Sequence, residues 1–242
     1  MARQAGLLIT TFVMLICLQS CSKNIDDIYT ENIKARGGAD QIAALTAQRI
    51  AGKLSTGSDN IAFTIRVKRP DCIRMNITTE REDMILASNG VTVWVDTPYD
   101  SEGAIPMPEA EAVKLEEMYD VLFGLLQSRR EKGDSMILLG KEKVGEVQAY
   151  KIQAIQADGA IQDIYINADT YLEIKRSSSA VYGKNDVETV SLYEDYREVA
   201  GVMIPHAVKE FINDRLDHTT IYTHIEANVE MPDTLFVMPV TP

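Results

Sequence analysis

The stretch "NIAFTIRVKRPDCIRMNI", residues 60–77, decides how the rest of the sequence is interpreted. Apolar side chains recur at every second position along it, and they are Ile61, Phe63, Ile65, Val67, Ile73, Met75 and Ile77. Because successive side chains of a β-strand point to opposite faces, this alternation predicts strand structure with one apolar face. The same count of positions directs Arg69 toward the apolar face, where a charged group needs polar partners.

Alternating patterns of this kind continue toward the C-terminus and are separated by turn signals. The dipeptides Asn89-Gly90 and Asp158-Gly159 each stand between two extended segments and are typical of tight hairpins. The chain is therefore expected to form about ten to eleven strands joined mostly by short turns. Short connections imply that neighbouring strands are antiparallel.

One long segment interrupts the strands. Residues 97–108 contain several prolines and a glycine and are expected to form a loop, whereas residues 109–131 have helical periodicity. The apolar stripe of this inserted helix includes Met118, Leu122 and Leu125. A helix of this kind either covers one face of the sheet permanently or forms a movable lid over a cavity, and the sequence supports both interpretations.

The expected fold is mainly β with a few helices (α+β). A long antiparallel sheet with one apolar face must close on itself or be covered. A helical opening over residues 22–47, interrupted at Gly37-Gly38, and the inserted helix are together too short to cover so many strands. We therefore expect a curved, incompletely closed antiparallel β-barrel with helices covering its mouth and an apolar cavity inside. The residues expected to line this cavity are Ile61, Phe63, Ile65, Val67, Met75 and Ile77.

The N-terminal residues have the pattern of a secretory signal. Arg3 precedes the apolar run "LLITTFVMLICL", which is shorter than the about 20 residues that a membrane-spanning helix needs. The following "LQSC" resembles the lipobox of bacterial lipoproteins, although Gln19 departs from the small or apolar residue usual there. This resemblance implies that Cys21 becomes an acylated N-terminus; the alternative is an ordinary secretory signal followed by an unrelated cysteine. The expected organisation is a signal peptide (1–20), a lipidated N-terminus and tether (21–30) and one half-barrel domain (31–242).

Three segments of the chain resemble the LolA/LolB family of periplasmic lipoprotein carriers and outer-membrane acceptors. They are "VKRPDCIRM" (67–75), "EREDMILASNGVTVWVDTP" (80–98) and "NVEMPDTLFVMP" (228–239), and the similarity runs in order from about Glu31 to Pro239. The resemblance implies an open antiparallel β-barrel with a helical lid, which agrees with the architecture expected from the residue pattern. It also implies that the protein handles acylated lipoproteins in the periplasm.

The resemblance further implies a role for Arg69. In this family the arginine of the "VKRP" motif lies inside the barrel mouth and hydrogen-bonds to the lid, so Arg69 is expected to be a latch that closes the empty cavity. Ile73 stands at the cavity mouth where the family carries an aromatic residue, so at this position the resemblance does not imply the same handling of cargo. The alternative for Arg69 is a strand-end arginine whose head group extends to water at the rim.

The charge of the chain limits its partners. The full chain has a net charge of −12, and removal of the first twenty residues takes away only Arg3, which leaves −13. A domain this acidic is a poor binder of nucleic acid or of an anionic membrane surface. Attachment to a membrane is therefore expected through the lipid on Cys21.

The sequence gives no support for catalysis. It contains no GxSxG, HExxH or P-loop motif. Of its three histidines, His218 and His224 would lie about 20 Å apart along one strand, too far to share a metal ion. We expect no enzyme activity, no metal site and no cofactor.

Two classes of function remain, with a third behind them. The first is a monomeric, lipid-anchored protein of the outer membrane that faces the periplasm, binds acyl chains of lipids or lipoproteins, and takes part in lipoprotein sorting or insertion. The second is a non-enzymatic envelope sensor or protein-binding lipoprotein that uses the same half-barrel. The third is a structural lipoprotein whose cavity is filled by its own side chains. Copurification of a lipid ligand separates the third class from the first two.

Overall fold

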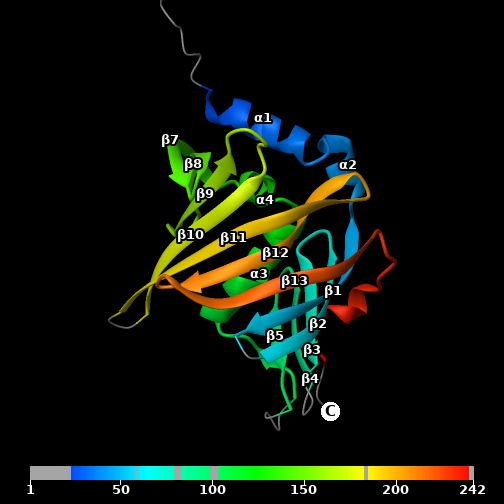
Figure 1. Ribbon diagram of the computed structural model, residues 1–242. Helices are drawn as coiled ribbons and strands as arrows, with labels where there is room; N and C mark the ends of the chain where they lie inside the picture. The colour runs from blue at the N-terminus through cyan, green and yellow to red at the C-terminus, as the bar shows by residue number, and fades with distance from the viewer. Residues whose placement is uncertain (1–22, 58, 79–82, 99–102, 183–184, 240–242) are drawn as a thin grey trace, which may run out of the picture.

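The computed structural model describes residues 23–57, 59–78, 83–98, 103–182 and 185–239, and Figure 1 shows their arrangement. These residues form one 13-stranded sheet in the order β6-β5-β4-β3-β2-β1-β13-β12-β11-β10-β9-β8-β7. Every neighbouring pair of strands is antiparallel. The one long step in the order joins β1 to β13, so the first and last strands of the chain are paired.

The strands are β1 (Ala47–Thr56), β2 (Asp59–Lys68), β3 (Cys72–Thr78), β4 (Asp83–Asn89), β5 (Val93–Asp96), β6 (Ile105–Pro106), β7 (Ser135–Val144), β8 (Val147–Ile155), β9 (Ile161–Asn167), β10 (Glu173–Tyr182), β11 (Asn185–Val199), β12 (Val202–Ile212) and β13 (Arg215–Ala227). The helices are α1 (Ile25–Ala35), α2 (Ala39–Ala44), α3 (Glu109–Phe123), α4 (Leu125–Glu131) and the short 3₁₀ helix η1 (Asp233–Leu235).

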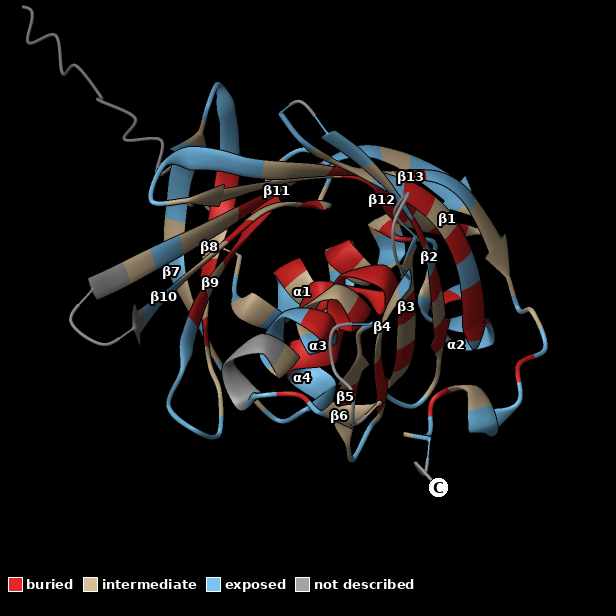
Figure 2. Cartoon of the chain, turned by 90° about the horizontal axis from the view of Figure 1, so that it is seen from below, coloured by how far each residue is buried: buried red, intermediate tan, exposed pale blue. Residues whose placement is uncertain are grey.

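The sheet is an open half-barrel that curves around helices α3 and α4 (Figure 2). Strands β6 and β7 form its two edges and are not paired with each other. The mainly antiparallel, incompletely closed barrel expected from the sequence is therefore confirmed. The strand count is higher than the expected ten to eleven, and one additional strand is β6, which lies in residues interpreted as loop.

Helix α1 belongs to the folded domain. Its first turn has a capping box, in which the Asn24 side chain accepts a hydrogen bond from the Asp27 backbone and the Asp27 side chain accepts one from the Asn24 backbone. Ile28 on its inner side is fully buried. Residues 25–30, which the expected organisation assigned to the tether, are therefore helical, and Ile28 packs into the core.

The inserted helical segment consists of two helices rather than one. Helices α3 and α4 meet at Gly124, which has a φ of +113°, a conformation that L side chains rarely adopt. A Cβ at this position would lie 3.2 Å from Nη1 of the buried Arg36, so the site also lacks room for a side chain. The single helix expected over residues 109–131 is thus wrong, and Leu125 is not part of the stripe on α3.

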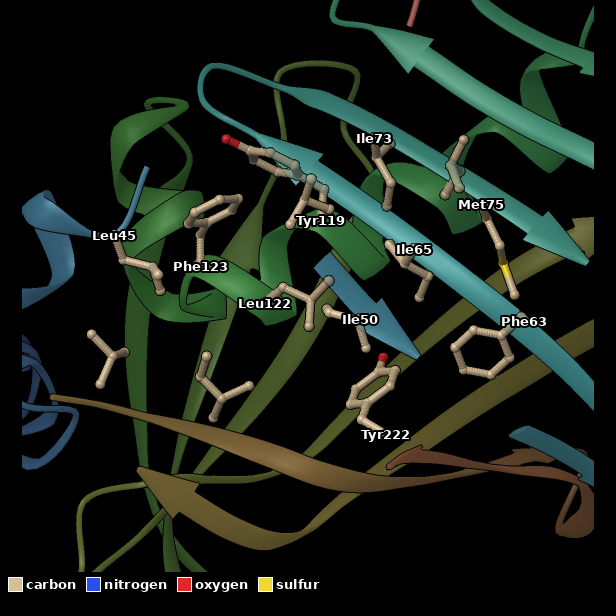
Figure 3. Close-up of a cluster of buried hydrophobic side chains, with 14 of the residues drawn as sticks. Leu45, Ile50, Phe63, Ile65, Ile73, Met75, Tyr119, Leu122, Phe123 and Tyr222 are labelled. Atoms are coloured by element: carbon tan, nitrogen blue, oxygen red, sulfur yellow. The ribbon is translucent and has the colours of Figure 1, made fainter. Parts of the chain in front are cut away.

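The inner face of the half-barrel is filled by α3. Figure 3 shows Tyr119, Leu122 and Phe123 of this helix among strand side chains such as Ile50 and Ile65. We call this group the α3 cluster; its buried members are Ile42, Leu45, Ile50, Phe63, Ile65, Val67, Ile73, Met75, Leu115, Tyr119, Leu122, Phe123, Val202, Ile204 and Tyr222. The expected apolar cavity is therefore occupied by the side chains of the helix that was expected to cover it.

The C-terminal segment covers the outer face of the first strands. Trp94 of β5 is fully buried, and its indole Nε1 donates a hydrogen bond to the Phe236 carbonyl at 2.9 Å. Arg74 of β3 donates to the Leu235 carbonyl at 2.9 Å. These contacts hold residues 233–236 against the sheet on the side opposite α3.

Candidate functional site

The apolar face predicted from residues 60–77 lies against α3. Its buried members in the α3 cluster are Phe63, Ile65, Val67, Ile73 and Met75. Ile77 packs at the margin of the cluster, and Ile61 is half-buried. From the helix, Leu122 is fully buried in the same cluster and Met118 packs at its edge. Leu125, on α4, instead packs with α1 and with strands β8 and β9.

Arg69 directly follows β2 and contacts the helices. Its guanidinium carbon lies 4.4 Å from the centre of the Phe123 ring at the end of α3. Nη1 lies 3.7 Å from Oε2 of Glu131 on α4, and Nε donates a hydrogen bond to the Leu45 carbonyl at 3.2 Å. The side chain is 25% exposed, so most of its surface is covered by these partners. Arg69 therefore joins the end of β2 to three helical segments.

Two small cavities border the turn between β2 and β3. One has a volume of about 160 Å³ and lies between Ile73, Glu116 and Tyr119; the other, of about 300 Å³, lies beside Arg69 and Glu131. Burial raises the pKa of Tyr119 to about 12 and also raises the pKa of the Glu116 carboxyl. Burial thus disfavours the charged form of both groups where the helix meets this turn.

A buried charged group connects α3 to α4. Asp120 is fully buried, pairs with Arg129, and accepts a hydrogen bond from Lys132 Nζ at 2.8 Å. Burial raises the pKa of Asp120, and the two cations oppose this effect. The pairs fix the angle between the two helices across Gly124.

A polar cluster on β9, β10 and β11 also contacts α3 on the inner face of the sheet. Arg176 of β10 is 5% exposed, lies 3.0 Å from the Glu117 carboxylate on α3, and donates a hydrogen bond to Ser191 Oγ at 3.1 Å. Gln162 of β9 donates to the same Glu117 carboxylate at 3.0 Å. Helix α3 is therefore held to the sheet by apolar contacts on one side and by a charged cluster on the other.

Two connected cavities lie beside this charged cluster. The inner cavity has a volume of about 60 Å³ and is bordered by Arg176 and Tyr193. A wider groove of about 330 Å³ leads outward between α3 and the strands β9–β12. The two spaces share Lys114, Glu117 and Glu210 as lining residues, so the groove adjoins the inner cavity.

The sequence analysis did not identify this polar cluster. Arg176 is followed by three serines, so no apolar alternation marks the inner face of its strand. Glu117 stands one helical turn before Val121 of the apolar stripe, a position from which a side chain reaches the same neighbours. That spacing was the one available signal.

One group of possible metal ligands occurs among the described residues, and it is Glu210, Asp217 and His218. Lys114 Nζ lies 4.0 Å from Glu210 Oε1, and Asp217 already contacts His218 Nδ1 at 2.9 Å. Because each member has a partner and Asp217 is exposed, we propose no metal site here.

The expected lipidation site, Cys21, lies outside the described residues. None of the helices in the described ranges has the length and apolar character needed to cross a membrane.

Comparisons with known proteins identify the fold. No family model and no curated protein matches the sequence. Among solved structures, a LolA superfamily protein from Nitrosomonas europaea has a TM-score of 0.61 and 15% identity, with 89% of this chain and 98% of that chain covered. A DUF1329 family protein from Desulfovibrio piger has a TM-score of 0.60 and 12% identity over 89% of this chain and 98% of the other. A putative outer membrane lipoprotein-sorting protein domain from Vibrio parahaemolyticus has a TM-score of 0.56 and 9% identity over 87% and 94%.

Identities this low show a shared fold and leave activity to other arguments. The three neighbours cover nearly the whole half-barrel. The chain therefore has a fold similar to that of LolA superfamily proteins.

Proposed function

We propose that this protein is a lipid-anchored protein of the cell envelope that binds acyl chains of lipids or lipoproteins between the half-barrel and α3. The observation that carries this proposal is the α3 cluster, in which one helix packs on the apolar inner face of β1–β3. An apolar surface of this size on a curved sheet is suited to hydrocarbon chains once the helix moves aside. The structure then corresponds to the closed, unliganded form.

The contacts of Arg69 suit a latch for that closed form. They consist of one ring contact, one long ion pair and one hydrogen bond, all made to helical segments. Such contacts are individually weak, about 0.5–2 kcal/mol each, so a bound chain can replace them. Arg69 therefore biases the helix toward the sheet without fixing it there.

The proposed location at the outer membrane rests on the N-terminal sequence, in which Cys21 is the expected lipidation site. If Cys21 is acylated, the protein cannot leave its membrane, so an acceptor or local chaperone at the outer membrane fits better than a soluble shuttle. The proposal includes no catalytic step.

A protein-binding or sensing role is the second candidate, and the filled inner face favours it. A half-barrel whose apolar surface stays covered by α3 would present its outer faces and edges to a protein partner instead. The two candidates differ in whether a lipid is bound.

The test is native mass spectrometry, with lipid extraction, of the protein purified without its Cys21 anchor. The acyl-binding proposal predicts a substoichiometric adduct whose extracted mass is that of an acylated lipid. Protein free of ligand, which also gains no adduct after incubation with a diacylated lipopeptide, would contradict acyl binding and leave the protein-binding candidate.

A further inference from the structure

The inner cavity beside α3 is bordered by two residues that each have a buried polar atom without a hydrogen-bond partner. Among the described residues, Nη1 of Arg176 and the hydroxyl of Tyr193 make no hydrogen bond of normal geometry, although both atoms are shielded from solvent. Arg176 is 5% exposed and Tyr193 is 4% exposed. Buried donors without partners are rare and call for an explanation. Both residues line the same cavity of about 60 Å³.

The charges around the cavity restrict what it can hold. The cations Arg176 and Lys114 line it together with the carboxylates Glu117 and Glu210, so the formal charges of these four groups cancel. Glu117 already lies 3.0 Å from Arg176, and Glu210 lies 4.0 Å from Lys114. A carboxylate or phosphate would add a third negative charge beside two buried or half-buried acids. A neutral oxygen that accepts hydrogen bonds meets no such repulsion.

The apolar neighbours of the cavity indicate what is attached to that oxygen. Tyr222 and Met118 line the cavity and also pack in or against the α3 cluster, so the polar cavity adjoins the apolar inner face. The groove that leads outward is lined by the exposed apolar side chains of Val113 and Ile161. A molecule with one polar end and one hydrocarbon chain fits a polar cavity that adjoins apolar surfaces.

We propose that Arg176 and Tyr193 bind the ester or amide carbonyl oxygen at the head of an acyl chain while Glu117 of α3 stays beside Arg176, with the chain lying in the groove between α3 and strands β9–β12. This inference rests on the proposed function and makes it more specific, because it defines the polar end of the ligand and its orientation. The polar end enters through the groove beside α3, and the two side chains donate hydrogen bonds to its carbonyl oxygen.

The experiment compares two neutral lipids that differ only in the carbonyl groups. The probes are 1,2-dioctanoylglycerol, which has two ester carbonyls, and 1,2-dioctylglycerol, its ether analogue with the same chain length. Decanoate serves as the anionic probe. Binding is measured by isothermal titration calorimetry to the chain from Ser22 onward, which includes every described helix and strand.

The variant is Tyr193→Phe, which removes the unpartnered hydroxyl and leaves the ring. Its matched control is Tyr196→Phe on the same strand; the Tyr196 hydroxyl donates to the Glu173 carbonyl at 2.8 Å and does not line the cavity. Since no protein hydrogen bond of normal geometry is lost in Tyr193→Phe, this variant is expected to fold at least as stably as the wild type.

We expect the wild type to bind the diester at least about fivefold more tightly than the diether, and Tyr193→Phe to lose about three- to tenfold in affinity for the diester alone. Tyr196→Phe should keep the preference. Equal binding of both lipids, equal weakening of both by Tyr193→Phe, or tighter binding of decanoate than of the diester would overturn the carbonyl site while acyl binding stands. Absence of binding by all three probes would instead refute acyl binding itself.

Discussion

The guanidinium of Arg69 lies 4.4 Å from the centre of the Phe123 ring, so the end of β2 is in contact with the last turn of α3. The same side chain also reaches α4 through Glu131. One residue at the rim of the half-barrel therefore contacts both helices that fill it. This arrangement makes the position of the helices sensitive to one side chain.

Replacement of Arg69 by leucine is expected to weaken the closed form. Loss of the ring contact and the hydrogen bond should lower the free energy of unfolding by about 1–2 kcal/mol, measured by urea denaturation. The variant should also retain more copurified lipid than the wild type, because its closed form is less stable relative to the lipid-bound form. The control is Lys68→Met, which removes the same charge from the adjacent position; Lys68 Nζ donates to the Met231 carbonyl on the C-terminal segment. Equal lipid retention in both variants would argue against the latch.

Replacement of Leu122 by alanine should separate stability from binding. Leu122 is fully buried between α3 and the sheet, so its truncation is expected to cost about 2–5 kcal/mol in urea denaturation. The space left behind lies where a chain would bind, and affinity for dioctanoylglycerol should rise. As a control, Leu216→Ala at an exposed position should change the free energy of unfolding by less than about 0.5 kcal/mol and leave the affinity for dioctanoylglycerol unchanged. A fall in affinity for Leu122→Ala would contradict the placement of the chain.

The buried pair of Arg36 and Glu173 predicts strong coupling between α1 and β10. Their side chains are each 2% exposed, with Arg36 Nη1 at 3.6 Å from Glu173 Oε1. Arg36→Met or Glu173→Gln alone should cost about 3–5 kcal/mol, because each leaves a buried charge without its partner. The double variant should cost clearly less than the sum of the two, as measured in a double-mutant cycle by urea denaturation. Additive losses would show that the pair is not coupled.

Buried tyrosines predict a loss of stability at alkaline pH. Burial raises the pKa of Tyr193 to about 12, whereas an unfolded tyrosine has a pKa of about 10. Between these values the unfolded chain binds fewer protons than the folded one, so the free energy of unfolding falls as pH rises; below about pH 10 the contribution is fully present. Burial shifts the pKa of Tyr119 and Tyr222 in the same direction. Urea denaturation from about pH 9 to 11 should show the decline, with a shallower slope in Tyr193→Phe. An identical slope in that variant would contradict the contribution of Tyr193.

The period of two in residues 60–77 predicted the strands β2 and β3 and their apolar face, because burial of one strand face produces alternation in the sequence. The turn dipeptide Asn89-Gly90 likewise fixed the end of β4. The break at Gly124 was missed because an isolated glycine inside a helical pattern does not by itself reveal a positive φ. The strand β6 was missed because two residues carry no periodicity.

The polar cluster of Arg176, Glu117 and Gln162 on the inner face could not be predicted from one sequence. The contact between Glu117 and Arg176 joins residues far apart in the chain, and only the pairing of β9, β10 and β11 brings them together beside α3. Arg69 could be predicted because its position continues a local alternation. Charges whose partners lie on distant strands leave no such trace.

The central claim is that an acyl chain binds between α3 and the inner face of the half-barrel. It is tested most directly by the distance between spin labels at Val113 on α3 and at Thr64 on the outer face of β2, both exposed, measured by pulsed electron paramagnetic resonance in a Cys72→Ser background. The account predicts a single distance in the free protein and a longer, broader distribution after addition of dioctanoylglycerol. An unchanged distance, under conditions where calorimetry shows the lipid bound, would contradict it.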